Sequence, residues 1–301
     1  MATSARIDRT SDRIAPEQIE DVLRQLWREV EAQLDGPLTR ALTTNLVAVT
    51  STADVDRLLA EIERLKARHR SRIFIVERTD AIDALEVQVK VQARPVRHGG
   101  ESVLEQVTLR CPRSADARIP SIIRARLAVD VPTHLYWSGP LTEDGWLLSA
   151  LTRAADHVIA ASGRFDNPAS DRDRLVSWVG KDWCDLTEFR TRPWRRALAE
   201  AFEHFEWSPE FPTAVRIEHA DQSASRAASL ALARWIQARL QAHVATSATL
   251  SERSPFGEPG RIVLEHTQTK VVLERKADQP RIEVRVHRSD TLTTDFTVLP
   301  S

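Results

Sequence analysis

The sequence predicts a layered α/β protein with two domains. In the first half of the chain, short apolar runs rich in β-branched residues alternate with segments whose apolar residues recur at helical spacing. Between residues 85 and 109 the period changes to a strict alternation, which is typical of antiparallel strands. After residue 261 almost every segment reads as a strand. A length of 301 residues suits two domains of this kind.

The first elements predict a parallel sheet. Residues 15–34 form a helix, since Ile19, Val22, Leu23, Leu26 and Val30 fall on one face and Pro16 suits a first turn. A buried strand follows at residues 43–50, then a helix at 55–65 and a second buried strand at 72–77. Ser51 and Asp54 match a capping box at the start of that second helix. Strand, helix and strand in this order imply a right-handed crossover between parallel neighbours.

The next elements extend this sheet and make it mixed. Residues 85–91 and 103–109 alternate apolar and polar side chains around His98-Gly99-Gly100, so we expect an antiparallel hairpin at the sheet edge. The segments that follow are a helix at 119–129, a strand at 133–137, a helix at 146–154 and a strand at 157–161. The order of all these elements predicts a Rossmann-like N-terminal domain.

The polar segment 167–174, which contains Pro168, predicts the domain boundary. We therefore expect an N-terminal domain over residues 1–168 and a smaller α+β domain over residues 169–301. The expected elements of the second part are helices at 171–180, 193–206 and 223–243 and strands at 213–219, 261–266, 270–275, 281–287 and 291–298.

The loops after the parallel strands carry no nucleotide-binding motif. Neither G-x-G-x-x-G nor G-x-x-x-x-G-K-[ST] occurs, and the whole chain has nine glycines. A close approach of backbone to phosphate needs glycine, so no cofactor is expected. One alternative stays open: Arg164, beside Ser162-Gly163, and the Ser138-Gly139 turn could form the anion pocket of a sugar-phosphate-binding enzyme or sensor.

Patterns of metal-dependent or nucleophilic catalysis are also missing. There is no H-E-x-x-H, no Cys/His spacing of a zinc site and no G-x-S-x-G, so neither a metal nor a catalytic residue is predicted. Glu101 and Glu105 flank one strand and are expected to be exposed carboxylates. Cys111 and Cys184 lack a C-x-x-C spacing and are expected to be reduced thiols. A regulatory disulfide between them would require proximity that sequence does not give.

Composition narrows the classes of partner. The formal net charge is −1, whereas nucleic acids and acidic membranes select a strong positive excess. No apolar run approaches the roughly 20 residues that span a bilayer. Residues 1–13 are polar and lack the apolar region of a secretory signal. A cytoplasmic protein that binds neither nucleic acid nor membrane is expected.

Tryptophan and arginine gather after residue 177. The chain has eight tryptophans and one tyrosine, and Trp178, Trp183 and the run Arg190 to Arg196 lie close together in sequence. Tryptophan and arginine are enriched at the centres of protein interfaces because they offer large area and several fixed donors. The alternative interpretation places the tryptophans in a core and the arginines on a solvated helix face.

Four segments follow one another in the chain: residues 44–49 (TNLVAV), 69–73 (HRSRI), 131–139 (VPTHLYWSG) and the set Asp185-Leu186, Arg190, Pro193, Trp194 and Arg195. In this order and spacing they resemble the glucose-6-phosphate dehydrogenase assembly protein family, OpcA. Three positions depart from the family pattern: Arg70 stands where a proline is usual, Tyr136-Trp137 where a Trp-Trp pair is usual, and Ala161-Ser162 where an Asp-Ser is usual.

The resemblance implies a non-catalytic partner of glucose-6-phosphate dehydrogenase. Such proteins promote the assembly or the active state of that enzyme, and thereby the oxidative pentose phosphate pathway. On this basis, allosteric activation through a protein–protein contact is expected. The expected contact residues combine interface residue types with the family-like segments: Arg190, Arg192, Trp194 and Arg195, with Arg72 second.

Overall fold

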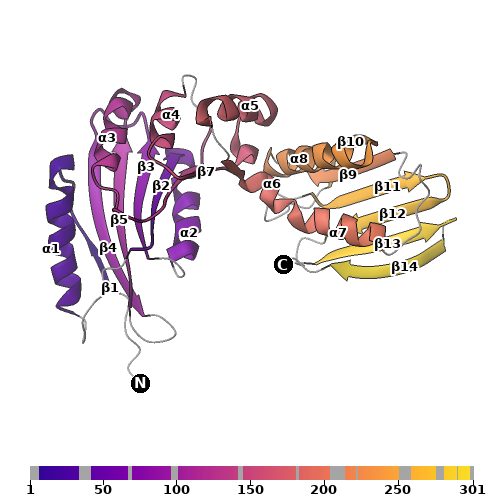
Figure 1. The fold of residues 1–301 in the computed structure, drawn as a ribbon, viewed down its shortest axis with the longest axis horizontal. Coiled ribbons are helices and arrows are strands. Elements are labelled where there is room, and N and C mark those ends of the chain that lie inside the picture. The colour runs from indigo at the N-terminus through magenta and orange to yellow at the C-terminus, as the bar shows by residue number, and fades with distance from the viewer. Residues whose placement is uncertain are drawn as a thin grey trace. The chain divides into compact units, whose positions relative to one another are not determined.

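A computed structural model describes residues 7–33, 42–66, 70–95, 101–141, 145–180, 183–203, 214–221, 223–250, 259–275, 281–289 and 291–298. The chain forms two compact units (Figure 1). The first comprises residues 1–160 and 169–184, and the second residues 161–168 and 185–301. The chain therefore passes between the units three times, after residues 160, 168 and 184.

The first unit is built on a mixed sheet of eight strands in the order β1-β4-β5-β3-β2-β6-β7-β8 (Figure 1). The pairs β5–β3, β3–β2, β2–β6 and β6–β7 are parallel, whereas β4 pairs antiparallel with β5 and with β1. The strands are β1 Ile7–Thr10, β2 Thr44–Ser51, β3 Ser71–Arg78, β4 Glu86–Pro95, β5 Glu101–Cys111, β6 Thr133–Trp137, β7 His157–Ala160 and β8 Trp183–Asp185.

This order winds outward from β2 in both directions, as in a Rossmann fold, so the predicted fold class is confirmed. The chain connects the parallel neighbours β3 and β5 through strand β4, whereas such a connection usually contains a helix. The expected turn between β4 and β5, residues 98–100, lies outside the described residues. The helices of the unit are α1 Ile19–Glu31, α2 Val55–Lys66, α3 Ile119–Arg124, α4 Trp146–Thr152 and α5 Pro168–Val179.

Apolar periodicity accounts for these elements. Strand β3 is buried over almost its whole length, as its continuous apolar run predicts. In β4 the alternating residues Val87, Val89 and Val91 are fully buried, and α1 packs against this strand. The expected helix over residues 119–129 instead ends at Arg124, and Val129 is 81% exposed. Ser51 donates to the Asp54 carboxylate rather than completing a capping box with the backbone.

The second unit contains a six-stranded sheet in the order β10-β9-β11-β12-β13-β14. Strands β9 and β10 are parallel and joined by α8, and the other pairs are antiparallel. The elements are α6 Leu186–Arg190, α7 Arg192–Glu203, β9 Ala214–Ala220, α8 Ser223–Leu240, β10 His243–Leu250, β11 Arg261–His266, β12 Thr269–Glu274, β13 Ile282–Arg288 and β14 Thr291–Val298.

The two faces of this second sheet differ in chemistry. Helix α7 packs on β13 and β14, and α8 on β9 and β10, so that one face forms an apolar core (Figure 1). On the other face, Val263 and Val272 lie among charged side chains that pair both along and across the strands. The pairs are Arg216 with Glu218 and Glu265, Arg261 with Glu218, Lys270 with Glu265, and Arg285 with Glu274 and Glu283.

Candidate partner-binding surface

A buried clamp fixes the start of α6 in the second unit. The Asp185 carboxylate caps this helix, because its Oδ1 accepts the backbone N–H of Thr187 at 2.9 Å. The same oxygen accepts the N–H of Ser162 at 3.1 Å, and Thr187 Oγ1 accepts the N–H of Gly163 at 2.8 Å. Two segments of the second unit that are distant in sequence are thus tied together at the point where α6 begins.

Helix α7 buries the tryptophan of the family-like segment. Trp194, Ala197, Leu198 and Ala201 follow helical spacing and are buried against the sheet. The Trp194 side chain has no exposed surface. Its indole N–H finds no acceptor among the described residues, so the ring is held by packing alone. This residue therefore builds the core that supports α7.

Phe189 and Arg192 form an exposed pair at the junction of α6 and α7. Phe189 is 49% exposed, and the Arg192 guanidinium carbon lies 4.0 Å from the centroid of its ring. Such stacking holds the planar guanidinium in place while its edge stays open to solvent. Arg190 is half-buried, and within the described part of the chain no carboxylate pairs with Arg190 or Arg192.

The neighbouring arginines of α7 are in different environments. The Arg195 guanidinium lies 5.4 Å from the Trp235 ring, and its Nε has no acceptor in the described part of the chain. Burial lowers the pKa of Arg195, the Glu188 carboxylate opposes that change, and Arg192 adds to it. Arg196 instead pairs with Glu200 at 2.7 Å. We call Phe189, Arg190, Arg192, Arg195 and Arg196 the α6–α7 arginine surface.

The structure places four of the five sequence-predicted contact residues on α6 and α7. Arg190, Arg192 and Arg195 belong to the α6–α7 arginine surface, whereas Trp194 points into the core beneath it. Sequence reasoning missed Phe189. The available signal is its position between Glu188 and Arg190 in a short polar helix. Such a helix has solvent-exposed sides on which an aromatic side chain can lie.

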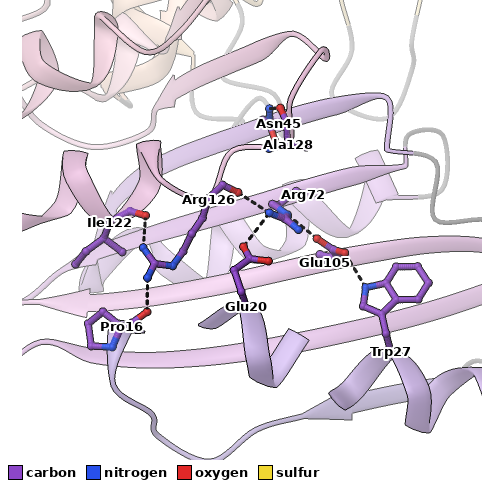
Figure 2. A network of polar contacts seen from close by, with 9 residues as sticks. All are labelled: Pro16, Glu20, Trp27, Asn45, Arg72, Glu105, Ile122, Arg126 and Ala128. Carbon is purple, nitrogen blue, oxygen red and sulfur yellow. Dashed lines mark hydrogen bonds and ion pairs between the residues drawn. The ribbon is translucent and has the colours of Figure 1, made fainter. Parts of the chain in front are cut away.

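Arg72, the fifth residue, lies in the first unit at the centre of a buried network (Figure 2). Its Nε donates to Glu105 Oε2 at 2.5 Å, and its NH1 donates to Glu20 Oε1 at 3.1 Å and to the Arg126 carbonyl at 2.5 Å. The other oxygen of Glu105 accepts the indole N–H of Trp27 at 2.7 Å. Glu105 was expected to be exposed, but it is fully buried, so this expectation was wrong. The side chain of Glu101 lies outside the described part of the chain.

This network joins α1 to the amino ends of the parallel strands. Arg72, near the start of β3, faces Glu105 in the middle of β5, and Glu20 and Trp27 come from α1. Nearby, Asn45 at the start of β2 exchanges two hydrogen bonds with the backbone of Ala128 (Figure 2). Ligands of open α/β sheets bind at the opposite, carboxyl ends of the strands. The position and burial of Arg72 therefore assign it a role in positioning α1.

The carboxyl ends of the same strands are closed by protein groups. The Ser138 N–H donates to the Val49 carbonyl at 2.9 Å, and the next residue, Gly139, lies against the end of β2. Thr52, at the entry to α2, donates to Glu77, which pairs with Arg110 at 3.1 Å. The Thr52 hydroxyl and the Arg110 guanidinium at these strand ends are thus both engaged by Glu77.

The Ser162-Gly163 turn is also poorly suited to an anion. Its two N–H groups are the donors that such a turn would offer, but both are engaged by Asp185 and Thr187. The Asp185 carboxylate at this position would repel an anion. Arg164 belongs to the second unit, whereas the Ser138-Gly139 turn belongs to the first.

Other chemistries have little support in the described residues. These residues contain no group of three or more His, Cys, Asp or Glu that could hold a metal. They form no disulfide: Cys111 is buried and Cys184 is exposed. Burial, aided by Asp116, raises the pKa of Cys111 to about 12, so this thiol stays protonated at neutral pH. No helix in the described part of the chain is both long and apolar enough to cross a membrane.

Comparison with known proteins identifies the family. A model described as the glucose-6-phosphate dehydrogenase subunit N-terminal domain matches residues 62–177, and the corresponding C-terminal domain matches residues 182–298. The chain belongs to this family, OpcA. A Nostoc punctiforme protein described as a putative OxPP cycle protein OpcA is 28% identical over 158 residues, which are 49% of this chain and 33% of that protein. The match thus spans about a third of the relative's length.

Solved structures resemble the chain at low similarity. KijD10, a 3-ketoreductase from Actinomadura kijaniata, has a TM-score of 0.46 at 13% identity, covering 87% of this chain and 85% of its own. An aldose–aldose oxidoreductase from Caulobacter crescentus has a TM-score of 0.46 at 11% identity, covering 86% of this chain and 84% of its own. Likeness at this level says nothing about activity.

Proposed function

We propose that this chain is a non-catalytic protein that binds glucose-6-phosphate dehydrogenase and promotes its active state. The observation that carries the proposal is the match of both halves of the chain to domains of a glucose-6-phosphate dehydrogenase subunit family. The proposal places the chain in the cytoplasm, in support of the oxidative pentose phosphate pathway.

The geometry supports a binding role in two ways. At the carboxyl ends of the first sheet, Glu77 and Arg110 pair with each other instead of leaving a cationic site for phosphate. On α6 and α7, by contrast, Arg190 and Arg192 are accessible and have no carboxylate partner in the described part of the chain. Cationic side chains beside an exposed aromatic ring are typical of a protein contact surface.

Activation requires unequal binding to two states of the dehydrogenase. A partner that binds the active and inactive states equally shifts nothing. A coupling free energy of about 1–3 kcal/mol would change substrate affinity by roughly 5–150-fold. The proposed mechanism therefore needs a contact that is tighter in the active state, and it needs no reaction on this chain.

The test is a kinetic assay of purified glucose-6-phosphate dehydrogenase from the same source, with and without the full chain, across glucose 6-phosphate concentrations. We expect a several-fold lower KM or higher kcat in its presence, and no reduction of NADP by the chain alone. The matched control is the same chain after heat denaturation. Unchanged rate, apparent affinity and oligomer size would contradict the proposal.

A further inference from the structure

We infer that the α6–α7 arginine surface docks an acidic segment of the partner protein, with a carboxylate held by Arg190 and Arg192 and an apolar side chain resting on Phe189. This inference rests on the proposed function only in taking the dehydrogenase as the partner. It adds the chemistry of the contact, which the family match does not supply.

The local charge balance at the α6–α7 junction favours an anionic partner. Four arginines stand at this junction, and two are already satisfied or opposed: Arg196 pairs with Glu200, and Arg195 lies near Glu188. Arg190 and Arg192 have no carboxylate partner in the described part of the chain. The charged face of the second sheet differs, since its arginines Arg216 and Arg261 each pair with a glutamate. The junction therefore carries positive charge that a carboxylate would complement.

The Arg192 guanidinium is preorganised for binding. The ring of Phe189 holds the Arg192 guanidinium at 4.0 Å, so binding a carboxylate costs less side-chain entropy there than on a free arginine. Guanidinium groups bind carboxylates through paired N–H donors, which fixes direction as well as charge. Because Phe189 remains 49% exposed, an apolar residue of the partner can cover it at the same time.

The small extent of the cationic surface indicates which kind of anion it binds. A long polyanion such as nucleic acid is bound through many phosphate contacts on an extended basic surface. Here the proposed contact consists of two arginines and one aromatic ring, in a chain whose net charge is −1. A carboxylate next to an apolar side chain, as found on a protein surface, is the better match to one aromatic ring and two arginines.

The experiment measures the affinity of the full chain for the dehydrogenase at about 50 mM and about 300 mM salt. The test variant is R190Q/R192Q, and the matched control is R216Q/R261Q, which removes the same charge from the opposite face of the second sheet. We expect the test variant to bind at least about tenfold more weakly, F189A to weaken binding similarly, and the control to bind like the wild type. Added salt is expected to weaken the wild type more than R190Q/R192Q.

Equal binding by R190Q/R192Q and the wild type would overturn the inference while leaving the proposed function intact. Absence of any complex with the wild type would contradict the proposed function, and a second probe then decides the inference. This probe is a fluorescent peptide of alternating Glu and Phe. Binding that is lost in R190Q/R192Q would support the inference, whereas absent binding, or tighter binding of an oligonucleotide, would overturn it.

Discussion

Arg72 in the first unit and Arg190 with Arg192 in the second are all expected from sequence to be contact residues, but their environments are opposite. Arg72 is 7% exposed and donates to two carboxylates and a carbonyl. Arg192 is exposed and Arg190 half-buried, and neither pairs with a carboxylate in the described part of the chain. The same side chain thus serves two purposes, and burial together with charge balance tells them apart.

The difference is energetic as well as geometric. Glu105 has no exposed surface, so its charge depends on Arg72 and on the indole N–H of Trp27. A buried charge that loses its partner is strongly destabilising. An exposed arginine is surrounded mainly by water, so replacing it changes stability little. Such a side chain can act in recognition instead. Substitutions at the two places should therefore change different measurements.

The largest effect is expected for R72M. Removing the guanidinium leaves the buried Glu105 carboxylate without its cationic partner and removes the contact to Glu20 of α1. We expect a loss of about 3–5 kcal/mol in the free energy of unfolding. Chemical denaturation followed by tryptophan fluorescence measures it, because the eight tryptophans, Trp27 of this network among them, change environment on unfolding.

The double variant R72M/E105Q is the control for that prediction. The glutamine that replaces Glu105 keeps an acceptor for the Trp27 N–H but carries no charge, so the double variant should recover much of the lost stability. If R72M unfolds at the wild-type denaturant concentration and instead weakens dehydrogenase binding, Arg72 belongs with the contact surface and the comparison fails.

A smaller effect is expected for W194F. Trp194 is fully buried and its N–H has no acceptor in the described part of the chain, so phenylalanine removes ring volume and no hydrogen bond. We expect a loss of roughly 1–2 kcal/mol in stability from the cavity. The affinity for the dehydrogenase is measured by titration and corrected for the fraction of folded protein. It should stay within about twofold of the wild type. A large loss of affinity without a loss of stability would place the indole in the contact.

Much of the fold could be predicted from sequence, because burial on both faces leaves continuous apolar runs such as those of β2 and β3. The elements that were missed are short or polar: β1, β8, α6 and β10 carry little periodic signal. In particular, the helix predicted over residues 223–243 ends at Leu240, and His243 begins β10.

The site was predicted less completely, for a physical reason. Residue type pointed to both arginine sites, but exposure depends on partners that are distant in sequence. Arg72 meets Glu105 and Glu20, which lie 33 and 52 residues away. No local pattern reveals such a pairing, so residue type alone predicts the same contact role for the buried Arg72 and Trp194 as for Arg190 and Arg192. The structure separates them because it shows which side chains are covered.

The most direct test of this separation is hydrogen exchange of the full chain, alone and with glucose-6-phosphate dehydrogenase. Amides that a partner covers exchange more slowly in the complex. We expect slower exchange over residues 186–196 and unchanged exchange at the start of β3 and in the middle of β5, where Arg72 and Glu105 lie. Slower exchange around Arg72 with none over residues 186–196 would contradict it.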